Sequence, residues 1–289
     1  MHLTMILVAL GLAWWLRSRC SYPAGSWNQR WQRALSLFLL PPLLLLMTAT
    51  SVIYMGPEEE PMLWQWQGRF SYLLASGLLG LAGILLLKLA LKSFRSWQQV
   101  RTCPQLNFMG GHSRVLENPI PFSALIGFWQ PELLVTQGLL DTLDNAHLEA
   151  VFKHEQGHCY YRDTFWFFWL GCVRSYTAWL PNTEALWQEL LLLRELRADR
   201  WAAQQVDPLL LAESLLVVVS TMPVQSDNCC VAFSCAAPRN GLQQRIEALL
   251  AEPEAMREPS LWSWTWLLLA FLPLAAVPFH TCSHLSATH

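Results

Sequence analysis

The sequence predicts an α+β membrane protein that is mostly helical, crosses the bilayer several times and carries one folded domain outside it. Three observations lead to this fold class. The chain of 289 residues is 53% hydrophobic and 14% charged, with 16 tryptophans, which is far more apolar than an ordinary soluble domain. Long apolar runs lie near both ends of the chain. Between them, residues 101–259 have the mixed composition and the length of a single folded domain.

Four apolar runs are predicted to be membrane helices: Leu3–Leu16, Ala34–Met55, Phe70–Leu91 and Leu261–Phe279. The first could instead be a signal-peptide core, but its positive charges follow the run and no small-residue cleavage pattern is present, so we interpret it as a retained helix. The chain therefore divides into a three-helix membrane region (1–100), the folded domain (101–259), and a final helix with a short outside tail (260–289).

The distribution of basic residues predicts the orientation of these helices. The connection between the first two runs contains four arginines, whereas the acidic connection around Glu58–Glu60 contains only Arg69, at its end. Because cytoplasmic loops are enriched in Lys and Arg, the N-terminus is expected outside and the folded domain in the cytosol. The predicted location is the cell membrane, as in a multi-pass protein of a bacterial inner membrane, with the lipid bilayer as a partner.

The net charge and the cysteine content limit the possible partners of the chain and the state of its thiols. A net charge of −2 excludes nucleic acid as a direct partner, because phosphate binding needs a concentrated basic surface. The eight cysteines show no repeated framework and are interpreted as reduced thiols. Cys229, Cys230 and Cys235 could form a soft-metal or redox-responsive cluster, although ordinary buried thiols are the preferred interpretation.

The sequence His154-Glu155-Gln156-Gly157-His158 carries the strongest chemical signal in the chain. It falls within a predicted helix, Asn145–Tyr161, for which Asp144 is a good N-cap. Two histidines four residues apart lie on one face of a helix, so both rings can bind one zinc ion (Zn²⁺), with Glu155 beside them as the general base. The alternative is a surface helix with two unrelated histidines.

A tetrahedral catalytic zinc needs a third protein ligand and an open position for water. Glu195, in the predicted helix Thr183–Gln204, is the best candidate, and Asp199 lies four residues further along the same face. We expect Asp199 to orient His158 through its second ring nitrogen. A solvated helix with paired charges is the alternative for this segment.

A short strand before the zinc helix is the candidate site for pairing with an extended peptide substrate. It is bounded by Pro121 and Pro131. Its residues are Ser123, Ala124, Leu125, Ile126, Gly127 and Phe128. The apolar segment Phe165–Leu180, which follows the zinc helix, is expected to lie in the membrane interface rather than to cross. Of the other histidines, His147 is expected to be a capping or exposed residue, and His112 to lie in a Gly-rich turn without a metal role.

These motifs resemble the gluzincin membrane peptidases, and within them the BlaR/MecR family of antirepressor peptidases. The matching segments are His154-Glu-x-x-His158 with Asp163 five residues on, Leu180-Pro181-Asn182, Glu195-x-x-x-Asp199, Pro121-Phe122, Gly127-x-x-x-Pro131-Glu132-Leu133-Leu134 and Gln244-Arg245-Ile246-x-x-Leu249-Leu250. The resemblance covers about residues 100–255. It implies a cytosolic zincin-type metallopeptidase domain that binds one zinc ion and cleaves a winged-helix repressor of the BlaI/MecI type.

The sequence also departs from that family. The antibiotic sensors among these proteins carry a large penicillin-binding domain after the last helix, and this sequence has only about ten residues there, so sensing of β-lactams is not expected. Two alternatives stay open at this point. One is a quality-control peptidase similar to HtpX, and the other is a transmembrane signal receptor without catalytic activity.

Overall fold

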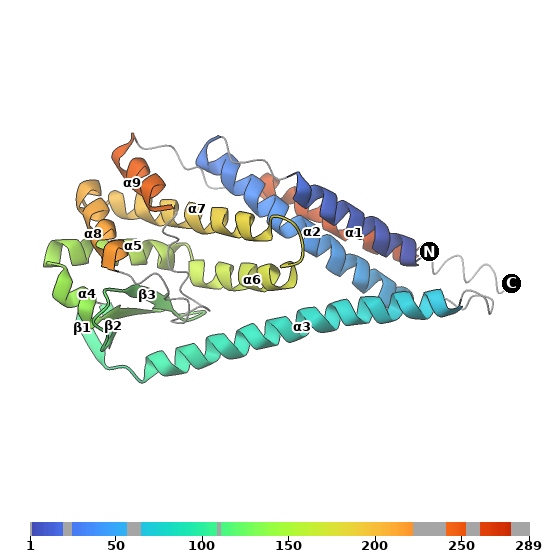
Figure 1. Cartoon of the computed structure of the whole chain (residues 1–289), viewed down its shortest axis with the longest axis horizontal. Helices are drawn as coiled ribbons and strands as arrows, with labels where there is room; N and C mark the ends of the chain where they lie inside the picture. The colour runs from blue at the N-terminus through green and yellow to red at the C-terminus, as the bar shows by residue number, and fades with distance from the viewer. Residues whose placement is uncertain are drawn as a thin grey trace. The chain divides into compact units, whose positions relative to one another are not determined.

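The computed structural model describes residues 2–19, 25–56, 65–108, 111–221, 241–252 and 261–278, and these are mostly helical with one small sheet (Figure 1). The α-helices are α1 (His2–Ser18), α2 (Trp27–Met55), α3 (Gln65–Arg101), α4 (Gln137–Thr142), α5 (Asn145–Tyr160), α6 (Asp163–Tyr176), α7 (Thr183–Ala203), α8 (Pro208–Thr221) and α9 (Leu242–Leu250). A 3₁₀ helix, η2, spans Leu261–Ala276. The strands are β1 (Gln105–Phe108), β2 (Gly111–Leu116), β3 (Ser123–Ile126) and β4 (Glu132–Thr136).

The chain forms two compact units. The first comprises Met1–Leu87, Cys172–Trp187 and Met256–His289, and the second comprises Lys88–Gly171 and Gln188–Ala255. Some predicted features lie outside the described residues, namely the acidic connection at Glu58–Glu60, the cysteines 229, 230 and 235, and the tail after the last helix.

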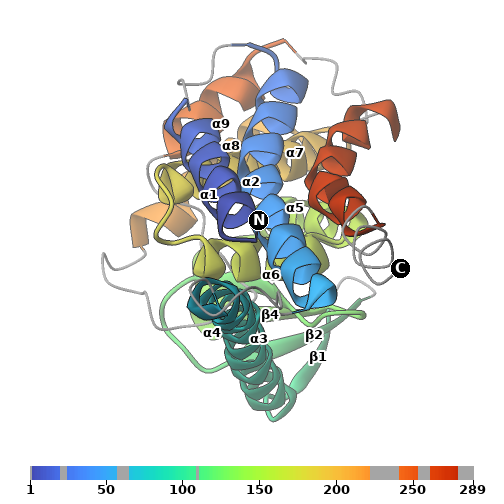
Figure 2. The same cartoon turned by 90° about the vertical axis from the view of Figure 1, so that its right-hand side faces the viewer.

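Helix α2 is the centre of the first unit, where it packs against α1 and η2 (Figure 2). Small and branched side chains fill the interface between α1 and α2, including Ala9, Ala49 and Val52. Arg17, at the end of α1, is fully buried and donates hydrogen bonds to the carbonyl oxygen of Phe38 (3.2 Å) and the hydroxyl of Thr183 (3.2 Å). A buried guanidinium must be hydrogen-bonded, so these contacts fix the end of α1 within its unit.

Two helical segments, Trp27–Met55 and Gly68–Arg101, are long and apolar enough to cross a membrane. Each contains a predicted span, Ala34–Met55 or Phe70–Leu91, and extends beyond it. The other two predicted spans correspond to shorter apolar helices, His2–Ser18 and Trp264–Ala275. The two long segments differ in how much of them is covered by other parts of the protein. In α2, 44% of the most apolar stretch is buried, whereas in α3 only 6% of it is buried.

The second unit contains the sheet, with strand order β1-β2-β4-β3. Strands β2 and β4 are parallel and the other two pairs are antiparallel, so β3 is an edge strand. Alternate residues face opposite sides. Ala124, Ile126 and Leu134 pack with Val100 at the end of α3, while Val135 on the other face packs with residues of α5. The edge strand thereby lies against the helix that carries the histidines.

Three details of the sheet differ from the sequence prediction. The predicted strand 123–128 ends at Ile126, because Gly127 adopts a φ of +134° and starts the turn to β4 with Phe128. A side chain at Gly127 would also meet the carbonyl oxygen of Gln130, at 2.8 Å from its Cβ. His112, expected in a turn, belongs to β2, and strand β1 was not predicted.

Candidate metal centre

Helix α5 begins where the sequence predicted, at an N-cap that fixes its first turn. The side chain of Asp144 accepts a hydrogen bond of 2.9 Å from the backbone nitrogen of His147. Leu148, Val151 and Phe152 bury one side of the helix in the core. The next two turns bring His154 and His158 into the interior, with side chains that are at most 10% exposed.

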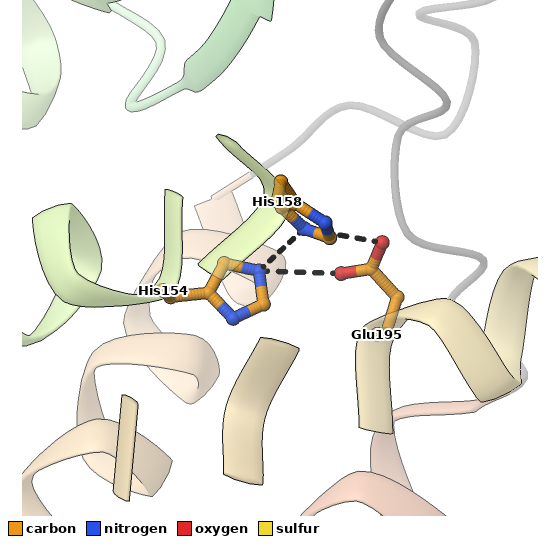
Figure 3. Close-up of side chains that lie close together, drawn as sticks. All are labelled: His154, His158 and Glu195. Atoms are coloured by element: carbon orange, nitrogen blue, oxygen red, sulfur yellow. Dashed lines mark hydrogen bonds and ion pairs between the residues drawn. The ribbon is translucent and has the colours of Figure 1, made fainter. Parts of the chain in front are cut away.

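Helix α7 brings Glu195 to the two histidines (Figure 3). Oε2 of Glu195 lies 3.3 Å from Nε2 of His154, and Oε1 lies 3.6 Å from Nε2 of His158. The two Nε2 atoms are 3.1 Å apart. One donor atom from each of the three residues therefore lies within 4.8 Å of the others, an arrangement that could hold a metal ion.

In each of the two histidines, the second ring nitrogen, Nδ1, lies close to a carboxylate. Nδ1 of His158 lies 2.7 Å from Oδ2 of Asp163. Nδ1 of His154 lies 2.8 Å from Oδ1 of Asp199, close enough for an ion pair although the N–H is not aligned as a hydrogen bond. Such outer partners hold the ring orientation and place the proton on Nδ1, which leaves Nε2 as the ligand atom.

Asp199 was expected beside His158, and the structure places it beside His154 instead. The reason is the direction of packing. His154 pairs with Asp199 and His158 approaches Glu195, so an earlier residue of α5 meets a later residue of α7 and the helices run in opposite directions. Spacing within α7 gives the shared face but not this direction.

The donor set fits a zinc ion. With Nδ1 of each ring directed to a carboxylate, two unprotonated Nε2 atoms would face each other across 3.1 Å, which is repulsive unless a cation or a proton lies between them. Two nitrogen ligands of a tetrahedral zinc, with bonds of about 2.0–2.1 Å, lie about 3.3 Å apart. Two imidazoles and one carboxylate are a usual ligand set for catalytic zinc.

Three arginines balance the buried carboxylates of this site. Arg245 of α9 donates two bonds of 2.7 Å to Asp199, from Nε and Nη2, and its Nη1 lies 3.4 Å from Oε2 of Glu195. Arg194 donates to Oε1 of Glu195 from Nη2 (2.5 Å) and from Nε (2.9 Å). Arg197 donates to Asp163. Each carboxylate oxygen has more than one lone pair, so Glu195 can keep an arginine and still bind a cation.

These charges set the protonation of the site. Burial raises the pKa of Glu195, but Arg194, His158 and Arg245 together hold it well below its usual range. Burial likewise raises the pKa of Asp199, and Arg245 more than reverses this effect. Burial lowers the pKa of His158, but the charge of Glu195 and the hydrogen bond with Asp163 raise it to about 9. Both carboxylates therefore stay ionised, as a metal ligand and its outer partner must be.

Glu155, the residue after His154 in α5, is held by a contact from the sheet. Its Oε1 accepts a hydrogen bond of 2.7 Å from the hydroxyl of Ser123, the first residue of β3. Glu155 is 8% exposed. The edge strand and the candidate base are thus joined directly, a contact that the sequence analysis did not anticipate.

Gly157, between the two histidines, allows α5 and α7 to approach closely. A Cβ at this position would lie 3.2 Å from the carbonyl oxygen and 3.3 Å from the Cα of Ala198. These contacts are tighter than side chains normally make. The glycine therefore sets the helix separation at which Glu195 reaches both rings.

The predicted site residues fall into two groups. His154, His158 and Glu195 meet in one cluster, Asp199 lies beside His154, and Glu155 contacts Ser123. Of the predicted edge strand, Ser123 contacts Glu155 and Ala124–Ile126 continue the edge, while Gly127 and Phe128 lie in the turn. His147 lies in the first turn of α5, with Nδ1 2.7 Å from Asp144 and Nε2 3.4 Å from Glu213 of α8.

The outer carboxylate Asp163 and the arginines were given no role in the sequence analysis. Asp163 follows Arg162, whose positive φ of 53° turns the chain at the end of α5 and returns the carboxylate to His158. A non-glycine residue with positive φ is uncommon and has no reliable sequence signal. Arg245 lies in a segment noted only for its family resemblance. Its spacing from Asp199, 46 residues, gives no indication of a contact.

A comparison with models of protein families, with curated proteins and with solved structures finds no match to this chain.

Proposed function

We propose that this protein is a membrane-bound, zinc-dependent endopeptidase. The observation that carries the proposal is the buried cluster of His154, His158 and Glu195, in which both Nε2 atoms and a carboxylate converge while each Nδ1 has its own carboxylate partner. A structural zinc site is normally closed by four protein ligands. This cluster offers three, and the carboxylate of Glu155, the residue after His154, accepts a hydrogen bond from Ser123.

The protein residues have distinct roles in the proposed reaction. A zinc ion held by His154, His158 and Glu195 would polarise the scissile carbonyl and lower the pKa of a bound water. Glu155 accepts the proton of that water on the carboxylate and then donates it to the leaving amine. Ser123 holds Oε1 of Glu155, which leaves Oε2 for the proton. Asp199 and Asp163 keep the two rings in the tautomer that directs Nε2 inward.

Strand β3 is the proposed site for the substrate main chain. In an antiparallel ladder, alternate residues direct their backbone groups to the partner strand. Thr136 donates its backbone N–H to the carbonyl oxygen of Phe122, so Ser123 and Leu125 direct theirs to the open edge. A peptide paired there would pass the carboxylate held by Ser123. This supports cleavage within an extended chain, hence an endopeptidase.

The membrane part of the proposal has three transmembrane helices before the peptidase region and one after it, with the peptidase region in the cytosol. Exposed apolar side chains of α3 support it, because Leu73 is 69% exposed, Leu87 is 60% exposed and Ile84 is 54% exposed. Contiguous apolar surface of this kind is suited to lipid. Reporters fused after Glu60, after Glu252 and at the C-terminus test the orientation, and the expected readings are outside, inside and outside.

The substrate that we propose is a cytosolic winged-helix repressor, as the resemblance to the BlaR/MecR peptidases implies. A regulator of this kind cuts one protein under one stimulus, whereas a quality-control peptidase cuts many unfolded ones. Proteomic comparison of cells with and without the protein should show one truncated DNA-binding protein. Broad accumulation of unfolded membrane proteins in its absence would favour the quality-control alternative.

The direct test of activity uses the purified full-length protein in detergent and a library of peptides from a digested bacterial proteome. Cleavage should stop when a chelator removes the metal and return when zinc is added back. Failure of the zinc-loaded protein to cut any peptide, with one equivalent of zinc bound, would contradict the proposal and favour the receptor alternative.

A further inference from the structure

Three exposed tryptophans gather on the surface of the second unit. Trp129, in the turn between β3 and β4, is 75% exposed, and Trp166 and Trp169 of α6 are 58% and 43% exposed. Phe165 joins them, because its ring centroid lies 5.4 Å from that of Trp129 and 5.2 Å from that of Trp166. These four residues are called the aromatic patch below. Exposed apolar side chains gathered in this way mark a surface that contacts another protein or a membrane.

Helix α6 runs beside the end of α3. A Cβ added at Gly171 would lie 3.7 Å from the side chain of Leu89, and Phe168 lines a surface groove together with Phe94. The later residue of α6 meets the earlier residue of α3, so the two helices run in opposite directions here. In the proposed topology α3 leaves the bilayer at this end. Helix α6 therefore runs towards the bilayer.

The contact with Leu89 gives the depth of the aromatic patch. Leu89 is close to the end of the predicted span, Phe70–Leu91. Trp169 and Trp166 precede Gly171 by two and five residues, which is about 3 and 8 Å along a helix. The polar layer between hydrocarbon and water is about 5–8 Å thick on each side of a bilayer. In the proposed topology both indole rings thus lie at the depth of the lipid headgroups, where tryptophan is enriched.

The exposed apolar face of α3 extends to the aromatic patch. Ile84, Leu87, Leu91 and Phe94 follow one another by three or four residues, so they lie on one face of the helix. Each of them is between 47% and 60% exposed. Phe94 lines the same groove as Trp129 of the β3–β4 turn. The face that is suited to lipid along the span therefore leads to this turn.

The charges around the aromatic patch favour lipid over a second protein as its partner. Arg162 is exposed and precedes Trp166 by four residues, on the same face of α6. Lys88, Lys92 and Arg95 are exposed at the end of α3. Basic residues beside exposed tryptophans are typical of surfaces that lie in a bilayer interface. Anionic headgroups supply the complementary charge.

We infer that the aromatic patch is a membrane-contact surface, which inserts among anionic lipid headgroups and holds the open edge of β3 close to the bilayer. Ile126, the last residue of β3, precedes Trp129 by three residues, which span at most about 11 Å. The consequence for the substrate rests on the proposed function. A peptide paired with β3 would be cut near the bilayer surface, so the substrate must be a protein that reaches this surface.

The test uses the full-length protein in lipid nanodiscs that contain a lipid with a photoactivatable diazirine in its headgroup. After illumination, mass spectrometry of the digested protein identifies the labelled residues. The β3–β4 turn and the first half of α6 should be labelled together with the end of α3. Leu209 of α8 and Leu250 of α9 are matched apolar controls, 54% and 62% exposed, and should stay unlabelled. Label confined to α3, label of equal strength on the two controls, or cross-links that join two copies of the protein through the aromatic patch would overturn the inference.

A pair of variants at Arg162 tests the role of charge. Arg162→Gln and Arg162→Lys place a new side chain at the same positive φ, but only lysine keeps the charge. In nanodiscs that contain phosphatidylglycerol, label on Trp166 and Trp169 should fall about fivefold in Arg162→Gln and persist in Arg162→Lys. In nanodiscs of phosphatidylcholine alone the two variants should be labelled equally. Equal label in the presence of phosphatidylglycerol would refute the anionic surface.

These measurements do not depend on catalysis, so they separate this inference from the proposed function. The predicted labelling pattern with no peptide cleavage by the zinc-loaded protein would retain the membrane-contact surface and refute the endopeptidase. Peptide cleavage by a protein whose β3–β4 turn and α6 stay unlabelled would overturn the inference alone.

Discussion

The hydroxyl of Ser123 donates a hydrogen bond of 2.7 Å to Oε1 of Glu155. The bond joins the open edge of the sheet to the glutamate of the histidine helix. In the proposed reaction it gives one serine two tasks, because the same residue starts the substrate-pairing strand and orients the general base.

Ser123→Ala should lower kcat about tenfold with KM and zinc content unchanged, because a hydrogen bond to a charged carboxylate is lost while the strand remains. Ser123→Thr keeps a hydroxyl and should recover most of the rate. Ser113→Ala is the matched control, since Ser113 is a buried strand serine whose hydroxyl donates to the carbonyl oxygen of Leu106 and not to a site residue that the structure describes. A rise in KM without a change in kcat would show that Ser123 acts on substrate binding alone.

Arg245→Gln should destabilise the protein by about 3–5 kcal/mol, the usual cost of leaving a buried carboxylate without its partner. The affected carboxylate is Asp199, which accepts both bonds of the guanidinium. Arg245→Lys should recover only part of the loss, because an ammonium group cannot reproduce the two parallel bonds. Thermal unfolding measures the effect, with Arg200→Gln, on α7, as the charge-matched control. Equal melting temperatures for Arg245→Gln and Arg200→Gln would show that the buried pair is not needed.

Gly157→Ala should weaken zinc binding about tenfold, since α7 must move away by a few tenths of an ångström and carries Glu195 with it. Gly171→Ala is the matched control within the same unit, because its added Cβ meets only Leu89, at an ordinary 3.7 Å. Titration with zinc against a competing chelator measures both variants. Unchanged affinity in Gly157→Ala would mean that the helix separation does not control the ligand geometry.

His147 links the start of α5 to α8 through Asp144 and Glu213, and these carboxylates raise its pKa above the usual value. A raised pKa in the folded state means that the contribution to stability is fully present below about pH 6.5 and is lost as the pH rises through the folded-state value. His147→Gln should therefore lower the melting temperature slightly at pH 6 and not at pH 9. The effect is small because both carboxylates are largely exposed. An equal loss at both pH values would assign it to helix packing.

Much of the helical framework could be predicted from the sequence, because apolar runs, caps and the i, i+4 spacing are local signals. The start of α5 at Asn145 and of α7 at Thr183 agree with the prediction. Strand β1 did not have such a signal, since it is only four residues long and half polar. The end of β3 depends on the positive φ of Gly127, which belongs to the turn.

The candidate site also contains features that could be predicted from the sequence and features that could not. His154, His158 and Glu195 could be chosen from spacing and residue type, and the structure brings their donor atoms together. The carboxylate partner of each histidine ring could not be predicted, because it depends on the antiparallel packing of α5 and α7 and on the turn at Arg162. Arg245 reaches the site from a separate helix, and such long-range contacts leave no pattern in a single sequence.

The most direct test of the central claim is the Glu155→Gln variant, measured for zinc content and for peptide cleavage in the same preparation. Glutamine cannot accept the proton of water but leaves His154, His158 and Glu195 in place, so we predict one bound zinc and no cleavage. Glu149→Gln, an exposed carboxylate on the same helix, should keep both, and Glu195→Ala should lose zinc. Cleavage at the wild-type rate by Glu155→Gln, or loss of zinc from it, would contradict the account.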